Sequence, residues 1–447
     1  MSRTRRLLSQ SSLLFVARIF GAGLIFLVQA GIARTWGSEI LADYLVLIAL
    51  ANIAAMIMPL GFQTIGAYFA AEYRAKGERQ TLASFLLRAY WHVGASALVI
   101  GALGVLYGLN FEVGAEALPL LPPFLILALA TGSVFMHGAV LVGLKHPIAG
   151  FLADGLARPL IILFAFVSVF LLANSDMALV GLAWTISVTY AAIAIGYGVL
   201  VWRTLHEVDD NPLREMSEEE PKRWWRFALP WVMISIATDF FFDLDLLFLS
   251  QLLDKHELAV FGVAARIFAL TSFGVTAVYA VLLPDMFEAD ANKDRPEFLR
   301  QLGDANLVAT GSAVVLIVAM AIGGPLVLWL FGPGFEQGLP ALLVLGLILV
   351  VRAAFGPSSI VLSLNDRPWA SLPAVGAGLG TLVILNVFLV PALADLGAAL
   401  AALGSILVWS ALLWREAYRR TDIDVSVWPR IRQLLSAKSQ ANPQSGA

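Results

Sequence analysis

The sequence predicts an all-α polytopic membrane protein with twelve transmembrane helices in two parallel-repeat six-helix lobes around a central cavity. Of its 447 residues, 59% are hydrophobic and only 14% are charged, whereas soluble domains carry about 45–50% apolar and about 25% charged residues. This excess of apolar residues cannot be buried in a water-soluble core. A membrane-spanning helix needs roughly 20 apolar residues, and the sequence contains twelve runs of this kind.

The twelve runs follow one another along the chain. Continuous apolarity favours helices, because the strands of a membrane barrel alternate polar and apolar residues. The first run follows Arg3, Arg5 and Arg6, like a signal peptide, but it lacks a small-x-small cleavage site, so we expect a retained helix. The runs are 13–33, 40–69, 89–109, 118–142, 150–172, 177–201, 227–250, 258–283, 305–331, 339–363, 369–391 and 396–414.

The basic residues indicate the orientation of these helices. Of the 29 Lys and Arg residues, 23 lie in alternate connections beginning with the N-terminus, while the opposite set holds two, Arg34 and Lys255. The remaining four lie inside the apolar runs. Because cytoplasmic loops are enriched in Lys and Arg, we expect both termini to be cytoplasmic.

The chain divides into four expected parts: an N-terminal six-helix lobe (1–201), a cytoplasmic linker (202–226), a C-terminal six-helix lobe (227–418) and a cytoplasmic tail (419–447). A weak internal repeat, offset by about 217–221 residues, relates the two lobes. An even number of helices in each half gives both halves the same orientation, as in transporters whose substrate site lies between parallel repeats. In the tail, apolar residues alternate with Arg430 and Arg432, which predicts a short interfacial helix.

Composition and motifs exclude several functions. The chain has no cysteine, which excludes disulfides, thiol catalysis and Cys-ligated metals. It contains no HExxH motif and no phosphate-binding GxxxxGK[ST] loop, and its connections are too short for a catalytic domain of about 50 residues or more. We therefore expect no enzymatic activity, no cofactor and no metal site. A net charge of −3 argues against a nucleic-acid partner.

Charged residues inside the apolar runs are the candidate site residues, because a charge near the bilayer centre costs at least about 2.5–3.5 kcal/mol. Arg18 either reaches the headgroups or binds substrate. Asp154 and Arg158 lie one helical turn apart and form either a structural pair or, through Arg158, a substrate site. Arg352 lies near the middle of the run 339–363 with no acid in its own helix, which favours a function.

Two acidic residues of the seventh run are candidates for ion coupling. Asp239 and Asp243 lie one turn apart, and burial would make Asp239 suitable for proton or cation exchange. Asp243 lies at a depth that matches Arg266 on the next helix, so a structural Asp243–Arg266 pair is the alternative interpretation. Polar residues such as Asn52 could bind sugars, but hydrogen bonds between helices are their more common use.

Several motifs resemble those of a known family. Asp243-Leu244-Asp245-Leu246-Leu247-Phe248-Leu249, Leu258-Ala259-Val260-Phe261-Gly262-Val263-Ala264-Ala265-Arg266 and Leu330-Phe331-Gly332-Pro333-Gly334-Phe335 carry the resemblance. On these motifs the chain resembles the polysaccharide-biosynthesis, O-antigen-type flippases of the multidrug/oligosaccharidyl-lipid/polysaccharide exporter superfamily. The likeness covers about residues 10–418. One departure is the connection Asn365-Asp366-Arg367-Pro368, where the family often has a glycine-rich segment.

This resemblance implies a function. Two six-helix lobes in a V would move a polyprenyl-(pyro)phosphate-linked oligosaccharide from the inner to the outer leaflet of the bacterial inner (plasma) membrane, by alternating access coupled to an ion gradient. Arg18, Arg158, Arg266 and Arg352 would bind the anionic headgroup. The expected partners are this lipid-linked oligosaccharide, the lipid bilayer, and a polysaccharide polymerase and glycosyltransferases.

Two other functions stay open at this stage. A multidrug/cation antiporter of the same superfamily would use an acidic cavity, which Asp239 and Asp243 could supply. A non-transporting membrane scaffold for polysaccharide assembly would recruit glycosyltransferases through its inner loops. Intramembrane charge argues against the scaffold, because scaffolding does not require it.

Overall fold

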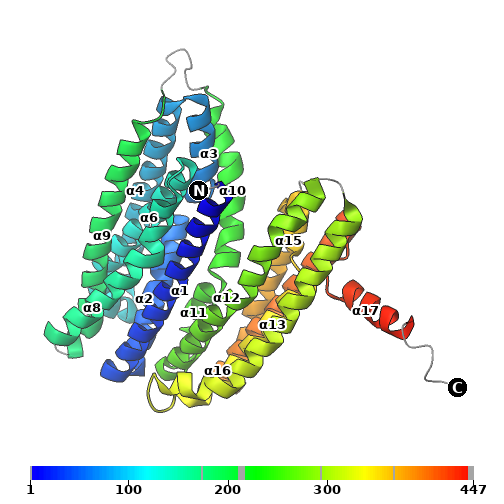
Figure 1. The fold of residues 1–447 in the computed structure, drawn as a ribbon. Coiled ribbons are helices and arrows are strands. Elements are labelled where there is room, and N and C mark those ends of the chain that lie inside the picture. Colours follow the sequence, from blue (N-terminus) through cyan, green and yellow to red (C-terminus); the bar gives the residue numbers. More distant parts are fainter. Residues whose placement is uncertain (1–2, 173–174, 210–216, 292–293, 366–367, 441–447) are drawn as a thin grey trace. The chain divides into compact units, whose positions relative to one another are not determined.

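Helices form most of the chain in the computed structural model, which describes residues 3–172, 175–209, 217–291, 294–365 and 368–440 (Figure 1). The chain separates into two compact units, a first unit of Met1–Leu247 and a second unit of Phe248–Ala447. Within the described residues, 10 helices are long and apolar enough to cross a membrane. The protein is therefore an all-α multi-pass membrane protein, as the sequence predicts.

The first unit holds the helices of the N-terminal half. They are α1 (Arg3–Trp36), α2 (Ser38–Ile57), α3 (Phe62–Lys76), α4 (Arg79–Asn110), α5 (Glu112–Ala117), η1 (Leu118–Leu120), α6 (Leu121–Gly143), α7 (Pro147–Leu152), the π-helical segment η2 (Ala153–Ala157), α8 (Arg158–Leu172), η3 (Ser175–Met177), α9 (Ala178–Leu205), α10 (Glu220–Asp239) and most of α11 (Phe241–Leu249).

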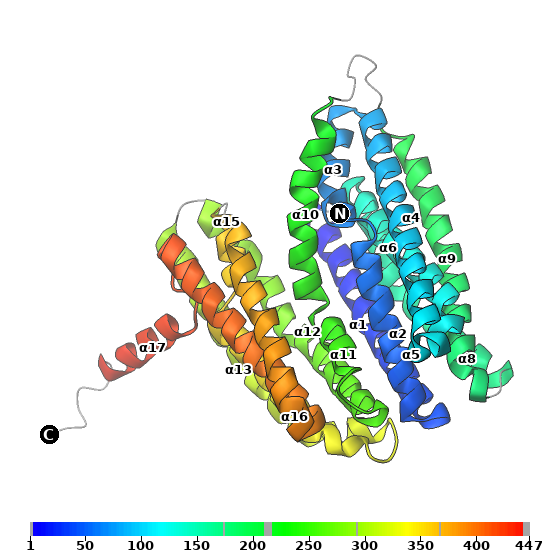
Figure 2. The same cartoon turned by 180° about the vertical axis from the view of Figure 1, so that it is seen from behind.

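The second unit contains the remaining helices, seen from both sides in Figures 1 and 2. They are α12 (Lys255–Ala291), α13 (Arg295–Trp329), η4 (Phe335–Gly338), α14 (Leu339–Phe355), α15 (Ser358–Leu364), η5 (Pro368–Ser371), α16 (Leu372–Thr421) and α17 (Trp428–Gln440). The long helices α12, α13, α14 and α16 pack against one another.

The ten spanning helices account for eleven of the twelve expected runs. Nine spans match one run each, and α16 carries both the eleventh and the twelfth run. These two runs meet at a kink at Ala394, where φ is 50°. The seventh run is the one without a single long span, because α10 ends at Asp239 and α11 begins at Phe241.

Two further runs, which we expected to form one continuous helix each, are divided into two helices. The run 40–69 is divided into α2 and α3 by Pro59-Leu60-Gly61, and Gly61 has a φ of +90° that favours glycine. The run 339–363 is divided into α14 and α15 at Gly356-Pro357. Gly356 also has a positive φ, 71°, and the following proline has no N–H to continue the helix.

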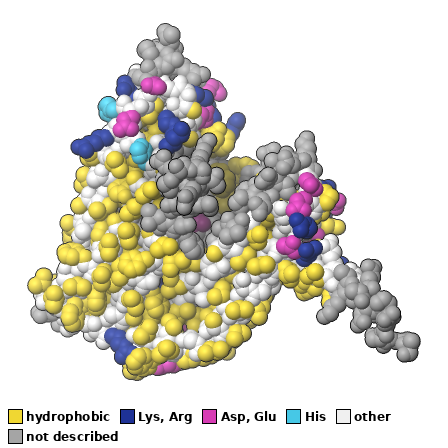
Figure 3. Space-filling model, viewed as in Figure 1, with side chains coloured by type: hydrophobic (Ala, Val, Ile, Leu, Met, Phe, Trp, Pro, Cys, Tyr) yellow, Lys and Arg dark blue, Asp and Glu magenta, His cyan; other side chains and the backbone are white. Residues whose placement is uncertain are grey.

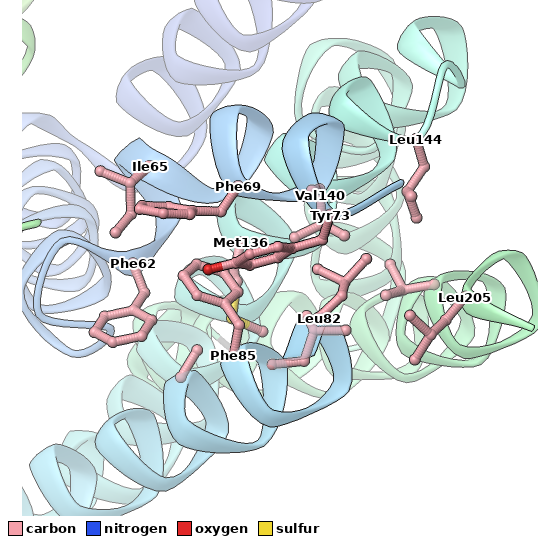
Figure 4. Packing of buried hydrophobic residues seen from close by; sticks show 14 of the residues in the cluster. Phe62, Ile65, Phe69, Tyr73, Leu82, Phe85, Met136, Val140, Leu144 and Leu205 are labelled. Atoms are coloured by element: carbon pink, nitrogen blue, oxygen red, sulfur yellow. The ribbon is translucent and has the colours of Figure 1, made fainter. Parts of the chain in front are cut away.

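Helix α10 packs onto α3 of the first unit through an aromatic cluster. Trp224 is 1% exposed and its Nε1 donates a hydrogen bond to the Tyr73 hydroxyl over 2.6 Å. Figure 4 shows the cluster that Trp224 joins, in which Phe62, Phe69 and Tyr73 of α3 face Phe85 of α4. The aromatic side chains bury a large apolar area, and the Trp224 ring meets those of Phe62 and Phe85 edge to face.

An ion pair and a close backbone contact strengthen this packing. Arg223 Nη2 lies 2.7 Å from Glu72 Oε2, and this hydrogen bond holds the pKa of the Glu72 carboxyl below its usual value. At Gly61 a Cβ would lie 2.4 Å from Ala228 O, so only glycine allows α10 to approach so closely. The contacts group all of α10 with the first unit, and the expected start of the second lobe at residue 227 stays a prediction.

In the second unit, a short irregular segment after α16 folds back onto the bundle; we call residues 422–427 the return segment. Its Val425 and Val427 are buried. The Val427 N–H donates to Ala354 O over 2.9 Å, and Asn306 Nδ2 donates to Val425 O over 2.6 Å. A Cβ at Gly356 would lie 1.8 Å from Val425 O. The return segment therefore covers the break between α14 and α15.

The surface has the distribution of a membrane protein. Figure 3 shows hydrophobic side chains along the first unit, while charged and histidine side chains gather at its end near α3 and the start of α10. Large apolar side chains such as Leu98, Leu172 and Ile322 are at least three-quarters exposed, at 77%, 87% and 79%. Water would oppose such exposure, whereas lipid chains accommodate it.

Candidate functional site

The polar network of the first unit joins residues from four separate elements: Asn52 of α2, Asp154 of η2, Arg158 of α8 and Asp243 of α11. Arg158 Nη2 donates to Asn52 Oδ1 over 2.7 Å, and Arg158 Nη1 lies 3.3 Å from Asp154 Oδ1. The Asn52 amide then donates from Nδ2 to Asp243 Oδ2 over 3.1 Å. The Asn52 amide thus accepts from the Arg158 guanidinium through Oδ1 and donates to the Asp243 carboxylate through Nδ2.

Arg158 is buried at the centre of this network. Its guanidinium lies 5.7 Å from the ring centre of Tyr190, which is itself fully buried, and such a geometry gives a cation–π attraction. The Asp154 side chain, in contrast, is 49% exposed. A buried charge is tolerated only when it is paired, and here one partner of the pair remains accessible from outside the bundle.

The local sequence explains why the helix widens beside Arg158. In an α-helix the N–H of residue 159 would bond to the carbonyl of Gly155, but Pro159 has no N–H. The Arg158 N–H instead reaches back to Ala153 O, one residue further than in an α-helix. On α1, a Cβ at Gly21 would lie 2.2 Å from Gly155 O, so glycine lets α1 approach the widened segment. π-helical segments of this kind are frequent at functional sites.

The two acidic residues of the seventh run lie on opposite sides of the break at Phe240. Asp239 is the last residue of α10 and is exposed, whereas we expected it to be buried. Asp243 lies in the first turn of α11 and is 8% exposed. Helix dipoles favour a negative charge at the N-terminal end of a helix and oppose one at the C-terminal end. The break therefore gives two neighbouring carboxylates opposite electrostatic environments.

The other expected site residues lie elsewhere in the two units. Arg18 is exposed on α1, one turn before Gly21. In the second unit, Arg266 is partly buried on α12 and Arg352 is exposed. The expectation that Arg352 lies near the middle of a continuous helix is wrong, because α14 ends at Phe355 and Arg352 belongs to its last turn. There the helix dipole favours its positive charge.

The structure thus brings Asp154, Arg158 and Asp243 together through Asn52. Asp243 belongs to the first unit and Arg266 to the second, so the expected Asp243–Arg266 pair stays a prediction. Sequence reasoning named Asn52 as a residue that could bind sugars or, more commonly, form hydrogen bonds between helices, and the structure shows such a bond between α2 and α8. It did not name Tyr190. Among the described residues, no group of three or more His, Asp or Glu side chains could hold a metal ion.

Comparison with known proteins identifies the family. The family model described as polysaccharide biosynthesis protein matches residues 7–290, more than half of the chain. The chain belongs to this polysaccharide biosynthesis protein family. The matched range contains the whole polar network around Arg158. A comparison with curated proteins gives no match.

Solved structures show that this polysaccharide biosynthesis family member has the fold of MOP-superfamily transporters. An inward-facing multidrug resistance MATE family transporter of this superfamily aligns with a TM-score of 0.72 at 17% identity, over 91% of this chain and 97% of that chain. An outward-facing one aligns with a TM-score of 0.60 at 16% identity, over 91% and 94%. A MOP superfamily transporter from Pyrococcus furiosus aligns with a TM-score of 0.58 at 15% identity, over 91% and 94%.

Proposed function

We propose that this protein is a flippase that moves a polyprenyl-(pyro)phosphate-linked oligosaccharide from the inner to the outer leaflet of a bacterial inner membrane. Membership of the polysaccharide biosynthesis family supports the class of substrate, and the transporter fold supports export. The observation that carries the proposal is Arg158, a buried guanidinium held within an apolar bundle whose polar partners orient it.

The chemistry of a guanidinium suits the headgroup of such a substrate. Its planar fork offers paired N–H donors to phosphate oxygens. At Arg158 a phosphate would replace Asp154, whose side chain is half exposed, so substrate and carboxylate would compete for one cation. The lipid tail can remain in the bilayer while only the headgroup meets protein.

The remaining arginines extend this proposal to both units. Arg18 in the first unit and Arg266 and Arg352 in the second would each bind the phosphate at a different depth. If several arginines bind the phosphate in turn, the free-energy cost of moving a dianion through hydrocarbon is divided into smaller steps. Asp239 and Asp243 are the proposed ion-coupling residues, and a polymerase and glycosyltransferases of the same pathway are proposed partners.

A multidrug/cation antiporter is the second candidate, because two of the similar solved structures are multidrug resistance transporters. The Pyrococcus furiosus transporter is described as having a binding pocket of reverse polarity, which suggests a different function for that protein. The polarity of the residues that contact substrate is therefore the property to test. A non-transporting scaffold, the third candidate, would move neither kind of substrate.

The test is transport by the purified protein in vesicles, with a fluorescent polyprenyl-pyrophosphate oligosaccharide and with a hydrophobic cation. We expect flipping of the first and no export of the second. Arg352→Ala should abolish most flipping, and Arg352→Lys should restore only part of it, because lysine keeps the charge but loses the fork. Arg34→Ala, which removes an exposed arginine at the end of α1, is the matched control.

Two results would contradict the proposal, and a third would limit it to the other arginines. Export of the cation without flipping would favour the antiporter, and no transport of either would favour the scaffold. Normal flipping by both Arg352 variants would remove this arginine from the substrate path. Arg158→Lys should give a smaller loss than Arg352→Ala, because Asp154 already holds the charge at that position.

A further inference from the structure

Helix α17 presents an apolar face that the rest of the second unit does not cover. Trp428, Leu434 and Leu435 are 57%, 46% and 63% exposed. Trp428 and Leu435 are seven residues apart and therefore lie on the same side of the helix, and Leu434 flanks them. Figures 1 and 2 both show α17 directed away from the bundle of α13–α16.

The anchoring of α17 fixes where along the bundle this apolar face lies. Arg430 forms a 2.7 Å ion pair with Asp304 of α13, and a Cβ at Gly303 would touch the Arg430 side chain at 3.0 Å. Asp304 directly precedes the apolar stretch 305–331, most of which lies in α13. The ion pair therefore holds the start of α17 at the end of a membrane-spanning stretch, which is the level of the lipid headgroups.

The return segment makes this anchoring rigid. Val425 is fully buried and Val427 is 2% exposed, and Asp424 accepts hydrogen bonds from the Ser426 N–H at 3.0 Å and from Trp414 Nε1 at 2.8 Å. A helix that follows a buried segment directly cannot move far from the bundle. Its apolar face must therefore meet whatever surrounds the protein at this level.

The charged residues around α17 indicate which kind of surface its apolar face meets. Arg432 is exposed on α17, and Arg419 is exposed in the last turn of α16. The neighbouring Arg420 is already paired with Glu416. Exposed basic residues beside an apolar helix face attract anionic lipid headgroups, and the attraction falls off within a Debye length. The same residues belong to the side of the membrane that the distribution of Lys and Arg marks as cytoplasmic.

We propose that α17 docks on the anionic lipid surface of the cytoplasmic leaflet. Trp428, Leu434 and Leu435 enter the boundary between headgroups and acyl chains, and Arg432 lies among the lipid phosphates. The Arg430–Asp304 ion pair sets the depth of the helix. This inference rests on the membrane-spanning fold and holds whichever substrate the protein transports.

The absence of cysteine from the chain permits a direct test on the full-length protein. A spin label is attached to Leu435→Cys or to Gln433→Cys, which lies about 200° around the helix and so on the opposite side. In vesicles of phosphatidylcholine with phosphatidylglycerol, the label at 435 should be several-fold more accessible to oxygen and less accessible to a water-soluble nickel chelate than the label at 433. In pure phosphatidylcholine, or with Arg432→Gln, this difference should shrink.

Two outcomes would overturn the inference. Equal accessibility of both labels to the nickel chelate in anionic vesicles would show that α17 lies in water. The label at 435 could also become less accessible to the nickel chelate as the protein density in the vesicle rises, whatever the lipid composition. That result would assign the apolar face to a second copy of the chain. Because Asp304→Asn removes the depth anchor, it should reduce the difference between the labels. Asp254→Asn, at an exposed acid between α11 and α12 that lies outside the return segment, should leave it unchanged.

Discussion

Arg158 donates a 2.7 Å hydrogen bond to Asn52 although the two residues are 106 positions apart in the sequence. The contact joins α8 to α2 at the point where the helix beside Arg158 widens. Because Asn52 also donates to Asp243, its amide lies between a guanidinium and a carboxylate. This neutral side chain thus holds groups of opposite charge in one network, which includes two acids and one cation.

The bridge predicts a stability effect for Asn52→Leu. Leucine fills a similar volume but leaves buried polar atoms of Arg158 and Asp243 without this partner, which costs about 1–3 kcal/mol for each unsatisfied group. We expect a lower thermal unfolding temperature in detergent and weaker transport. Asn110→Leu, at an exposed asparagine of α4 whose amide donates to Leu106 O of the same helix, is the matched control. An Asn52→Leu protein as stable as the control would show that the bridge contributes nothing.

The break at Phe240 predicts how Asp239→Asn behaves. Because Asp239 is exposed at the end of α10, the neutral variant should fold normally, and its unfolding temperature should match that of the wild type. If Asp239 exchanges the coupling ion, transport driven by an ion gradient should fall roughly tenfold or more, while substrate binding persists. Asp254→Asn, at an exposed acid between α11 and α12, is the control. Unchanged gradient-driven transport would exclude Asp239 from coupling.

The ion pair between Glu72 of α3 and Arg223 of α10 predicts that the stability of the fold depends on pH. The hydrogen bond from Arg223 keeps the pKa of Glu72 below the ordinary value of 4.5. The pair therefore stabilises the fold at neutral pH, and this contribution is lost as the pH falls below about 4.5. For a partly exposed pair we expect roughly 1 kcal/mol or less.

The measurement compares unfolding temperatures at neutral pH and at about pH 3.5. Glu72→Gln should lower the unfolding temperature at neutral pH. It should also reduce the difference between the unfolding temperatures at the two pH values. Glu219→Gln removes an acid that is 82% exposed in its pair with Lys222, and it should change neither. A Glu72→Gln protein with the same acid sensitivity as the wild type would contradict the assignment.

The contact between Gly356 and the return segment predicts a severe effect for Gly356→Ala. The residue has a φ of 71°, and an added Cβ would lie 1.8 Å from Val425 O. Backbone strain alone costs about 1–3 kcal/mol, and the clash adds to it. Gly376→Ala, at a helical glycine of α16 with open space around it, should instead be neutral or slightly stabilising. Equal unfolding temperatures for the two variants would show that the return segment moves away at little cost.

The orientation of the helices can be tested with single cysteines, since the chain has none. Labels within 112–116, 254–257 and 334–337 should react with an impermeant reagent from outside the cell. Labels at positions 76, 215, 293 and 440 should react only after the membrane is opened. One reversed position would contradict the parallel arrangement of two six-helix halves.

The positions of the helices were predictable because apolar runs are a local property of the sequence. Two of the three breaks also carried a local signal, Pro59-Leu60-Gly61 and Gly356-Pro357. The break at Phe240 lies between Thr238-Asp239 and Phe241-Phe242, with neither glycine nor proline beside it, so no local pattern predicted it. Its consequence, the exposure of Asp239, was missed for the same reason.

The candidate site was predictable only where its residues are neighbours in the sequence. Asp154 and Arg158 are four residues apart, and helical geometry alone brings them to one face. The contact of Arg158 with Asn52 depends instead on which faces of α2 and α8 meet, and one sequence does not contain that information. The same limit applies to α10, whose Arg223 meets Glu72 across 151 residues.

Trp224 completes a core built by α3, α4 and α6, although in the sequence it is separated from those helices by the segment 210–216. If the gene is divided within 210–216, the C-terminal fragment keeps the Trp224 side chain that the N-terminal fragment needs. The two fragments should therefore complement each other when they are produced together, as split proteins do when one half supplies a missing core element. Trp224→Ala in the second fragment should prevent this reassembly.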